Sequence, residues 1–586
     1  MLNSSKFLSR SLVLLGLCLL SQSAEAKYGS GKTSTYVFVA EQSKVVRTGG
    51  IASVPLTYTI KGNFQLAIDP NAGSASFAHV DANATDDSPF KRTLDLNHVF
   101  NMTSLVGTVE PTGSIKFTGK ASDDSDINIT VTLQDNLAYL IGQTTPPPNS
   151  ADFFIFNLGA VAQLRKYAGG SGTAGDPYQI ATADDLMALG ETPADYDKHF
   201  ILTDDIDLYP NLPGGKVFDK AVIAPDTDPS KDWGQGTPFT GVFDGSGHTI
   251  LHLTIKGGGY LGLFGQLGWD LAAAEVKNMG VVDVNIIGSG RFVGGLVGYN
   301  NYGDVAQCYS TGAVSATSYV GGLVGYNWIG DVTHCSSTCQ VSGDDKVAGL
   351  VALNYEGHVT NCYSTGAVNG KDSVGGLVGG NARGHVSHCY STSAVTGASE
   401  VGGLAGTNFE GTVTQCYSTG AVSGSGARVG GLVGYNSGSV TDCYSTGMVS
   451  GATEIGGLVG YNSGKSGDVA HCYSTGAVSG TYNVGGLVGY NPFWAWGRIT
   501  SSFWDIDTSG RATSAGGIGK TTAEMQTGKT FLDAGWDFVN VWGIGENQTY
   551  PYLRKYSAAD INQDASVNFL DLAVLAENWL TDISDR

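Results

Sequence analysis

The sequence predicts an all-β protein built around a right-handed parallel β-helix. Cysteines recur every 27 residues from Cys308 to Cys443, and a Gly-Leu-x-Gly motif recurs with nearly the same period. Glycine supplies 85 of 586 residues, and charged residues make up only 15%. About three short strands and three turns fit into such a repeat, so each repeat is expected to form one coil that stacks about 4.8 Å from the next. The leucines of the motif are Leu263, Leu296, Leu323, Leu350, Leu377, Leu404, Leu432, Leu458 and Leu487.

Stacking places equivalent residues of successive coils in columns. One column consists of asparagines, whose side-chain amides can donate to one another from coil to coil and which tolerate a left-handed turn. These are Asn300, Asn327, Asn354, Asn381, Asn408, Asn436, Asn462 and Asn491. Eight cysteines follow residue 26, seven of them in one column. Neighbouring coils would allow disulfides, but a small apolar residue repeated at an inward position favours a ladder of buried free thiols.

The N-terminal residues 1–26 have the pattern of a signal peptide. Lys6 and Arg10 precede an apolar stretch, and Ala24-Glu25-Ala26 supplies the small residues of a cleavage site. We therefore expect a secreted or extracellular protein, or one attached to the cell surface.

The rest of the chain divides into four predicted parts. Residues 27–167 alternate apolar and polar side chains with period two, which predicts an N-terminal all-β domain of unknown function, either β-sandwich-like or a barrel. Residues 168–500 form the predicted β-helix, with a cap that includes a short helix over 183–189. Residues 501–556, with Trp504, Trp536 and Trp542, are expected to cap its other end. Residues 557–586 form a small C-terminal segment.

Charge and hydropathy exclude some partners. The formal net charge is −21, which argues against binding to nucleic acid or to anionic lipid. After the signal peptide, no stretch approaches the roughly 20 apolar residues that a membrane span requires.

The unit VGGLVGYN, as in residues 293–300, resembles the GLUG-motif family, which is named for the Gly-Leu-x-Gly repeat. This family occurs in bacterial surface adhesins and beside immunoglobulin-cleaving metallopeptidases. The segments GDPYQIATADDL, FTGVFDGSGHTI and SSFWDIDTSG are similar to the flanks of such arrays. The resemblance covers roughly residues 168–556 and implies a β-helix with an extracellular role, but no definite activity. The zinc-peptidase signature HExxH is absent from the sequence.

Tyrosines supply the candidate ligand-binding surface. Most repeated cysteines are followed by a tyrosine, and a second set precedes the asparagines. Stacked tyrosines offer flat faces and hydroxyl groups that suit sugar rings, although they can also simply stack and rigidify the surface. The candidate ligand-binding residues are Tyr309, Tyr363, Tyr390, Tyr417, Tyr444 and Tyr473.

Two further groups of polar residues have alternative interpretations. One outward column can hold a cation or form a solvated turn; it reads Asp304, Asp331, His358, His385, Thr412, Ser439 and Asp468. In the early coils, an acidic group can serve polysaccharide cleavage or simply form turns; it comprises Asp204, Asp205, Asp207 and Asp244.

The C-terminal segment carries a calcium-loop pattern. Oxygen-bearing side chains stand at loop positions 1, 3, 5, 9 and 12, and a backbone carbonyl is available at position 7. The predicted metal ligands are Asp560, Asn562, Asp564, Ser566, Asn568 and Asp571. The segment is similar to one half of a type I dockerin, which implies an EF-hand-like helical tail that docks onto a cohesin-like partner. Only one loop is present, and Ala565 replaces the usual glycine.

These observations predict a secreted or surface-attached, non-catalytic binding and adhesion scaffold. Its expected partners are extracellular polysaccharide or another surface component, and a cohesin-like or cell-surface partner for the tail. Calcium is the expected cofactor. The alternative is a polysaccharide-degrading β-helix enzyme, a lyase or a glycoside hydrolase, brought to its substrate by the dockerin-like tail.

Overall fold

The computed structural model describes residues 33–554 with short gaps. The gaps are 39–41, 50–55, 70–73, 87–92, 110–113, 122–123, 135–136, 146–153, 165–166, 213–215, 229–230, 232–233, 270–273, 465–466 and 494–496. The chain divides into two compact units, residues 1–166 and residues 167–586. The predicted signal peptide and the predicted calcium loop lie outside the described residues.

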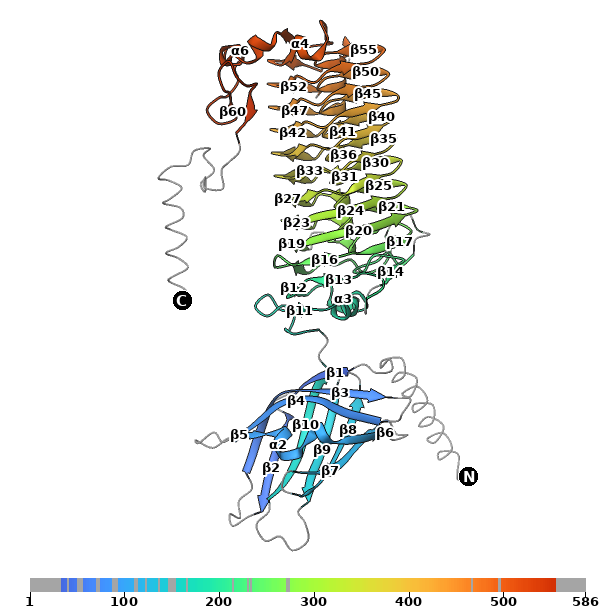
Figure 1. The fold of residues 1–586 in the computed structure, drawn as a ribbon, viewed down its shortest axis with the longest axis vertical. Coiled ribbons are helices and arrows are strands. Elements are labelled where there is room, and N and C mark those ends of the chain that lie inside the picture. The colour runs from blue at the N-terminus through green and yellow to red at the C-terminus, as the bar shows by residue number, and fades with distance from the viewer. Residues whose placement is uncertain are drawn as a thin grey trace, which may run out of the picture. The chain divides into compact units, whose positions relative to one another are not determined.

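The first unit is an antiparallel β-barrel (Figure 1). Its strands are β1 (Thr33–Phe38), β2 (Lys44–Gly49), β3 (Leu56–Asp69), β4 (Ser74–Asp86), β5 (Thr93–Asp95), β6 (Val106–Val109), β7 (Ser114–Lys120), β8 (Asp126–Gln134), β9 (Leu137–Thr145) and β10 (Phe154–Leu164). The pairings run from β3 through β4, β6, β7, β8 and β9 to β10, and both β1 and β2 join β10 back to β3. The predicted all-β character is confirmed. Of the two expected arrangements, a sandwich and a barrel, the barrel forms, because these pairings close a single sheet on itself.

The barrel interior is filled by apolar side chains that alternate along the strands. Phe64, Phe77 and Phe117 are no more than 1% exposed, and the Phe77 and Phe117 rings have centroids 4.4 Å apart. A short helix, α2 (Leu96–Phe100), adds Leu96 and Phe100 to the same core. The alternating pattern read from the sequence therefore marks the inward-facing residues.

The second unit contains a parallel β-solenoid in which the coils stack along one axis (Figure 1). One coil runs through β23 (Asp304–Ala306), β24 (Tyr309–Ser315), β25 (Ser318–Gly321) and β26 (Val324–Trp328), and β27 (Asp331–Thr333) begins the next. Pairing of Asp304 with Asp331 and of Tyr309 with Ser336 confirms the coil of 27 residues. The right-handed sense of the coil stays a prediction.

Four sheets, rather than three, surround the solenoid core. The first sheet has 12 strands, from β11 (Tyr178–Ile180) to β57 (Ile499–Thr500), and the second has 20, from β13 (Ile206–Asp207) to β59 (Ile518–Lys520). The third has nine strands, from β18 (Phe264–Leu267) to β56 (Val488–Tyr490), and the fourth has eight, from β21 (Arg291–Val293) to β55 (Tyr482–Gly485). We name these sheets 1, 2, 3 and 4 in that order. Sheet 2 has two strands in most coils, such as β28 (Ser336–Ser337) and β29 (Gln340–Ser342). A coil therefore holds four or five short strands, not the three expected.

Single residues in the left-handed conformation make sharp corners between strands. Before the cysteines this corner residue is Gln307, His334, Asn361, His388, Gln415, Asp442 or His471, with φ between 50° and 56°. Its backbone N–H stays paired, as when Gln307 donates to the Thr333 carbonyl of the next coil at 2.9 Å. Its side chain is left at the surface, because the neighbouring cysteine fills the interior.

The asparagine column forms the predicted hydrogen-bonded ladder. Asn300 Nδ2 donates to Asn327 Oδ1 at 2.7 Å, and the pattern continues through Asn462, which donates to Asn491 at 3.2 Å. Each amide nitrogen from Asn300 to Asn462 also donates to a nearby backbone carbonyl, such as that of Gly303. The left-handed residue lies elsewhere: Tyr302, two positions later, has the positive φ. From Asn300 to Asn462, the asparagines thus supply hydrogen bonds to a buried turn in each coil.

The cysteines are buried free thiols, which is the alternative that their inward position favoured. Cys335 Sγ donates to the carbonyls of Thr333 and Val305, at 3.2 and 3.4 Å. Burial raises the pKa of the Cys389 and Cys416 thiols well above its ordinary value, so both stay protonated at neutral pH. The column is therefore a structural part of the core.

Short elements cover both ends of the solenoid. At the N-terminal end, α3 (Ala183–Gly190) starts with a capping box between Thr182 and Asp185 and buries Leu186 and Leu189. At the other end lie α4 (Ile506–Ser509), α5 (Thr522–Met525) and α6 (Gly528–Leu532), with β60 (Trp542–Gly543) beside the last coils (Figure 1). Within the described part of the chain, no helix is long and apolar enough to cross a membrane.

Candidate functional site

The tyrosines that follow the cysteines form a ladder on the outer face of sheet 2. They begin successive short strands, β33 (Tyr363–Ser364), β38 (Tyr390–Ser391), β43 (Tyr417–Ser418), β48 (Tyr444–Ser445) and β53 (Tyr473–Ser474), which pair in register. In-register parallel strands place identical side chains above one another. From Tyr363 to Tyr473, adjacent ring centroids are 5.1, 5.0, 4.9 and 5.1 Å apart, and the ring planes are within 7° of parallel.

This stacking changes what the ladder offers to a ligand. The faces of the inner rings lie against each other, so the ladder presents ring edges and hydroxyl groups rather than the flat faces expected from the sequence. Burial raises the pKa of the Tyr417 hydroxyl to about 12. The hydroxyl therefore stays protonated at neutral pH, where it can both donate and accept a hydrogen bond.

The six predicted tyrosines are not equivalent. Ser336 occupies the column position between Tyr309 and Tyr363, so Tyr309 is separated from the rest of the ladder. Tyr309 is 39% exposed and Tyr363 is 37% exposed, whereas Tyr473 is only 2% exposed. Tyr473 donates from its hydroxyl to the Pro551 carbonyl at 2.6 Å and therefore belongs to the interface with the cap.

Tryptophans from the C-terminal cap cover this end of the ladder. The Trp542 ring is 6.1 Å from Tyr473 and 6.2 Å from Tyr444, and Trp536 packs against Trp542 at 4.5 Å. Trp542 Nε1 donates to Asp442 Oδ1 at 3.3 Å, and Trp536 Nε1 donates to the Ser501 carbonyl at 2.8 Å. These two tryptophans thus lie beside the last coils. Of the three tryptophans expected to cover the end of the stack, Trp504 packs onto the last coil, where its ring contacts Gly486.

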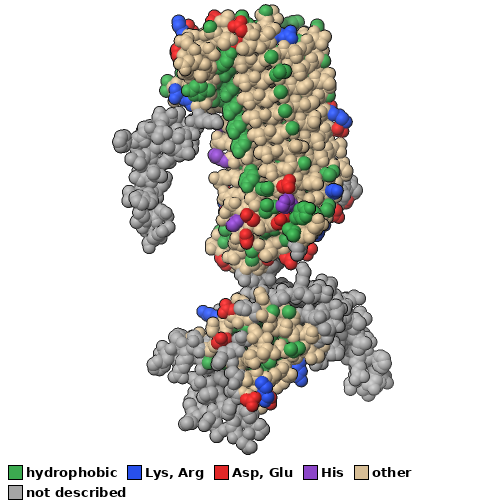
Figure 2. Space-filling model, in the orientation of Figure 1, with side chains coloured by type: hydrophobic (Ala, Val, Ile, Leu, Met, Phe, Trp, Pro, Cys, Tyr) green, Lys and Arg blue, Asp and Glu red, His purple; other side chains and the backbone are tan. Residues whose placement is uncertain are grey.

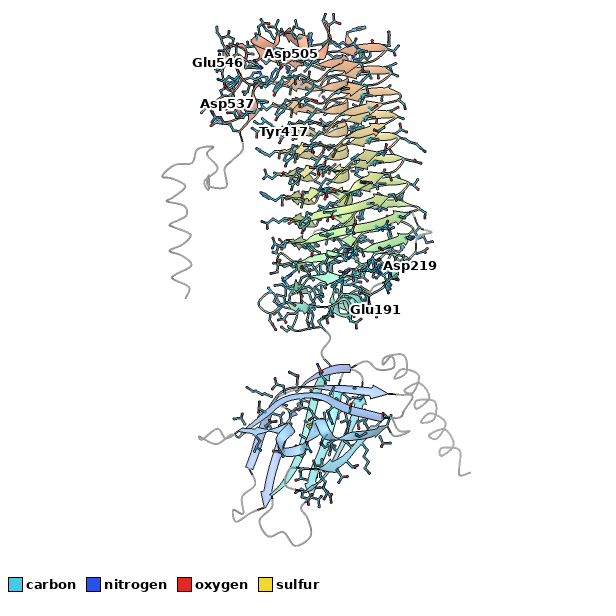
Figure 3. The ribbon with its side chains drawn as sticks, in the orientation of Figure 1. Glu191, Asp219, Tyr417, Asp505, Asp537 and Glu546 are labelled. Carbon is cyan, nitrogen blue, oxygen red and sulfur yellow. The ribbon has the colours of Figure 1, made fainter. Side chains whose placement is uncertain are left out.

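The cap and the ladder together enclose a groove of about 340 Å³. Its floor consists of Tyr363, Tyr390 and Tyr417, and Tyr417 points from the solenoid toward the cap (Figure 3). In Figure 2 a stripe of hydrophobic side chains runs along the solenoid beside the cap at this place. The remaining lining residues are Asn361, His388, Gln415, Asn540, Val541, Leu553 and Arg554.

Corner residues form one wall of the groove. Asn361, His388 and Gln415 stand immediately before the cysteines, and their left-handed backbone turns their side chains outward beside the tyrosines. Burial lowers the pKa of His388, and a hydrogen bond with Gln415 partly opposes that shift. His388 is therefore neutral at pH 7, and this wall offers uncharged amide and imidazole groups.

The cap supplies the opposite wall. Asp537 accepts hydrogen bonds from the backbone N–H groups of Val539 and Asn540, at 2.8 and 2.9 Å, which fixes the turn that carries Asn540. These bonds hold the pKa of Asp537 below its ordinary value. Arg554 donates to the carbonyls of Trp542 and Phe538, at 2.9 and 3.0 Å. Asn540 and Arg554 were not among the predicted site residues, because the packing of Trp542 beside Tyr473 brings them to the column and no local sequence pattern records that packing.

The Asp and His column does not assemble a metal centre. His358 Nδ1 is 2.9 Å from Asp331 Oδ1, and the rings of His358 and His385 stack at 5.0 Å. Asp468 pairs instead with Arg498 at 2.9 Å. Among the described residues, no group of three or more His, Cys, Asp or Glu side chains is arranged to hold a metal ion. The solvated-turn interpretation therefore describes this column better.

In the early coils, Asp205 and Asp207 lie beside histidines, whereas Asp244 lies beside an amide. Asp207 Oδ1 lies 2.7 Å from His252 Nδ1, and Asp283 Oδ2 lies 3.6 Å from the other ring nitrogen. Asp205 accepts from the backbone and hydroxyl of Thr249. Asp244 accepts from Asn278 at 3.0 Å. Hydrogen bonds from their partners lower the pKa of both Asp205 and Asp207, so these carboxylates are ionised at neutral pH.

A second aromatic pocket of about 260 Å³ lies near sheet 3. It is lined by Trp269, Tyr299, Asn301, Tyr302 and Trp328. Tyr299 stacks on Tyr326 at 5.2 Å, as expected for tyrosines that precede the asparagines. In later coils, Arg428 lies over the rings of Tyr435 and Tyr461, at 5.2 and 5.0 Å. The two tryptophans interrupt the repeat, and that irregularity is the sequence signal for this pocket.

Comparison with known families identifies the repeat. The GLUG motif matches residues 292–315, 316–342, 372–396, 397–423, 425–450 and 451–479. Halomucin from Haloquadratum walsbyi is 32% identical over 151 residues, which is 25% of this chain and 2% of halomucin. A protein of Evansella cellulosilytica described as a Gly-rich membrane protein is 43% identical over 60 residues, 10% of this chain and 7% of that protein. The chain thus spans only a small part of these relatives.

One solved structure is distantly similar. It is a crystal structure from Bacteroides ovatus, described as that of an immunoglobulin A1 protease, and its alignment covers 66% of this chain and 95% of that one. The sequence identity is 17% and the TM-score is 0.28, too low to support a functional argument. The comparisons therefore establish that this chain carries six GLUG motifs, which form coils of its parallel β-solenoid.

Proposed function

We propose that the protein is a secreted or surface-attached, non-catalytic scaffold that binds extracellular polysaccharide along the groove beside its tyrosine ladder. The observation that carries the proposal is the regular spacing of Tyr363, Tyr390 and Tyr417, whose ring centroids are 5.1 and 5.0 Å apart on the floor of that groove. A row of identical hydroxyl groups suits a polymer that repeats its own hydroxyl pattern.

The walls of the groove fit the same class of ligand. Asn361, Gln415 and Asn540 offer amides, which both donate and accept hydrogen bonds as sugar hydroxyls require. The ring edges of the tyrosines add apolar contact between these polar groups. The described lining residues include Arg554 and no carboxylate, although the whole chain has a net charge of −21. The groove therefore suits neutral or acidic sugar chains.

A location at the cell surface is supported by the relatives. The E. cellulosilytica protein is described as a membrane protein, and this chain shares part of its Gly-rich sequence. The signal-peptide pattern of residues 1–26 agrees with export.

Binding can be tested with the full-length chain. Pull-down on insoluble polysaccharides and affinity electrophoresis in soluble xylan, pectin, alginate and laminarin would measure retention of the parent, Tyr417→Ser and Tyr482→Ser. Ser336 already occupies the column position of Tyr417, so a serine there is compatible with the coil. Tyr482 is 67% exposed on sheet 4 and serves as the matched control.

We expect the parent and Tyr482→Ser to bind at least one of these polysaccharides equally, and Tyr417→Ser to bind about tenfold less tightly. Equal binding by the parent and Tyr417→Ser would show that the ligand lies elsewhere. No retention of the parent in the whole panel would contradict the proposal.

Polysaccharide cleavage is the second candidate function. It is favoured by His252, which lies between Asp207 and Asp283 in an early coil. An imidazole that is oriented by an ionised carboxylate can act as a general base. Assays of reducing ends and of unsaturated products, with Asp207→Asn and His252→Ala, would detect it. Cleavage by the parent that either substitution abolishes would replace the scaffold function with an enzymatic one.

Attachment through the C-terminal segment completes the proposal. Asp560, Asn562, Asp564, Ser566, Asn568 and Asp571 would supply the oxygen ligands of one calcium ion. The calcium-bound segment would then attach to a cohesin-like or cell-surface partner. Calorimetric titration of the full chain with calcium should show one site that Asp560→Ala and Asp564→Ala each weaken. If both variants bound calcium with the same affinity as the parent, the calcium site would lie elsewhere in the chain.

A further inference from the structure

The tyrosine ladder is interrupted by a single residue. Ser336 pairs with Tyr309 of the preceding coil and with Tyr363 of the following coil, so it stands where the neighbouring coils carry a ring. Coils are spaced by about 4.8 Å, which puts Tyr309 and Tyr363 about 10 Å apart along the solenoid axis. Where the ladder is uninterrupted, three stacked rings occupy the same length, as Tyr363, Tyr390 and Tyr417 do.

The two rings on either side leave this position open. Tyr309 leans over Gly280 of the preceding coil: a Cβ atom added at Gly280 would lie 2.4 Å from Tyr309 Cζ. The Tyr309 ring therefore packs on the side away from Ser336. Among the described residues, Tyr363 stacks on Tyr390 alone, at 5.1 Å, so its other face is directed toward the Ser336 coil. Both tyrosines are more than a third exposed, as an unstacked face requires.

Polar side chains border the resulting slot, which we define by Tyr309, Ser336 and Tyr363. The corner residues of these coils, Gln307, His334 and Asn361, lie two positions before the three slot residues. Asn361 Nδ2 lies 3.3 Å from His334 Nε2, which places an amide and an imidazole together at the rim. Tyr363 and Asn361 also line the end of the groove, so the slot continues it toward the N-terminal coils.

We propose that the slot receives one sugar ring of the polysaccharide that occupies the groove, with an apolar face of the sugar stacked on Tyr363. This inference rests on the proposed function. Two coil spacings separate Tyr309 from Tyr363, which leaves room for a ring between them. The rim offers groups that donate and accept hydrogen bonds, as sugar hydroxyls require. The Asn361 amide keeps a carbonyl oxygen and a second N–H beyond its contact with His334, and a sugar hydroxyl can use both, whereas a purely aromatic guest cannot.

The chain suggests a direct test, because tyrosine is the residue that the other coils use at this position. Ser336→Tyr should complete the ladder from Tyr309 to Tyr363 and fill the slot. Ser336→Ala keeps the slot open and is the matched control. Affinity electrophoresis in the soluble polysaccharides named above, and calorimetry with hexasaccharides cut from the one that binds, would compare the parent with both variants.

We expect Ser336→Tyr to lose about tenfold in affinity and Ser336→Ala to bind as the parent does. The melting temperature of Ser336→Tyr should equal or exceed that of the parent, which would show that the loss does not come from misfolding. Tyr363→Ser gives a second measure, since it removes the stacking face and should weaken binding without filling the slot.

The outcomes separate the two proposals. Undiminished binding by Ser336→Tyr, combined with weakened binding by Tyr417→Ser, would overturn the slot and leave the groove intact. A parent that binds none of the polysaccharides would overturn both.

Discussion

The two ends of the tyrosine column have the same residue in the same register but different surroundings. At the C-terminal end, Tyr473 is 2% exposed beneath Trp536 and Trp542, and its hydroxyl is bound to a carbonyl of the cap. Toward the N-terminal end, Tyr363 is 37% exposed and, within the described part of the chain, stacks only on Tyr390. The repeat thus supplies a periodic surface, and non-repeated neighbours decide which part of it stays accessible.

Replacing a buried and an accessible member of the column should separate these two roles most strongly. Tyr473→Ser would leave a cavity beneath the cap and remove the bond to Pro551, so we expect a loss of about 3–5 kcal/mol in the free energy of unfolding. Tyr417→Ser should cost about 1–3 kcal/mol, because it removes mainly the stacking on Tyr390 and Tyr444. Differential scanning calorimetry of both variants would measure the contrast, and equal losses would contradict it.

The asparagine ladder allows a second comparison, between a buried column and an exposed one. Asn381→Ala would deprive Asn354 Nδ2 of one acceptor and Asn408 Oδ1 of its donor, so we expect a loss of about 1–3 kcal/mol. His385→Ala, on the exposed column of the same coil, should change stability by less than about 0.5 kcal/mol. Chemical denaturation would measure the free energy of unfolding of both variants. A larger loss in His385→Ala than in Asn381→Ala would contradict the view that the interior hydrogen bonds stabilise the coil more than the surface contacts do.

The smallest expected effect is a pH dependence at the contact between cap and ladder. Burial raises the pKa of Asp442, which accepts from Trp542 Nε1 at 3.3 Å. A carboxyl whose pKa is higher in the folded chain than in the unfolded chain destabilises the fold as pH rises through the folded pKa. Asp442→Asn should therefore raise the melting temperature slightly at pH 7.

This difference between Asp442→Asn and the parent should disappear at a pH below the ordinary aspartate pKa, since both side chains are then uncharged. Thermal melts at pH 7 and pH 3 test this. A difference that is the same at both values would mean that the charge of Asp442 is not its cause.

Much of the solenoid could be predicted because each coil repeats the previous one. The recurrence of Cys, Asn and Tyr at one period places each residue type in one column, and the registers of Asp304 with Asp331 and of Tyr390 with Tyr417 follow from that period. The number of strands in a coil could not be read in the same way. A corner made by one left-handed residue, such as Gln307 or His388, has no characteristic residue type.

Long-range packing accounts for the rest. The barrel closes because β1 and β2 both join β10 to β3, a pairing of distant strands that local alternation does not reveal. Asn540 and Arg554 line the groove because Trp542 packs beside Tyr473, and no motif in the sequence records this contact. The sequence shows that Ser336 replaces a tyrosine of the repeat, but only the positions of the Tyr309 and Tyr363 rings show that a space lies between them.

The most direct test of the central claim is the affinity of the full-length parent and of Tyr417→Ser for the same soluble polysaccharides, with Tyr482→Ser as the control. Binding by the parent and by Tyr482→Ser, reduced about tenfold in Tyr417→Ser, is the predicted result. Polysaccharide binding that is equal in all three proteins, or that is absent from the parent, would contradict a binding site on the tyrosine ladder.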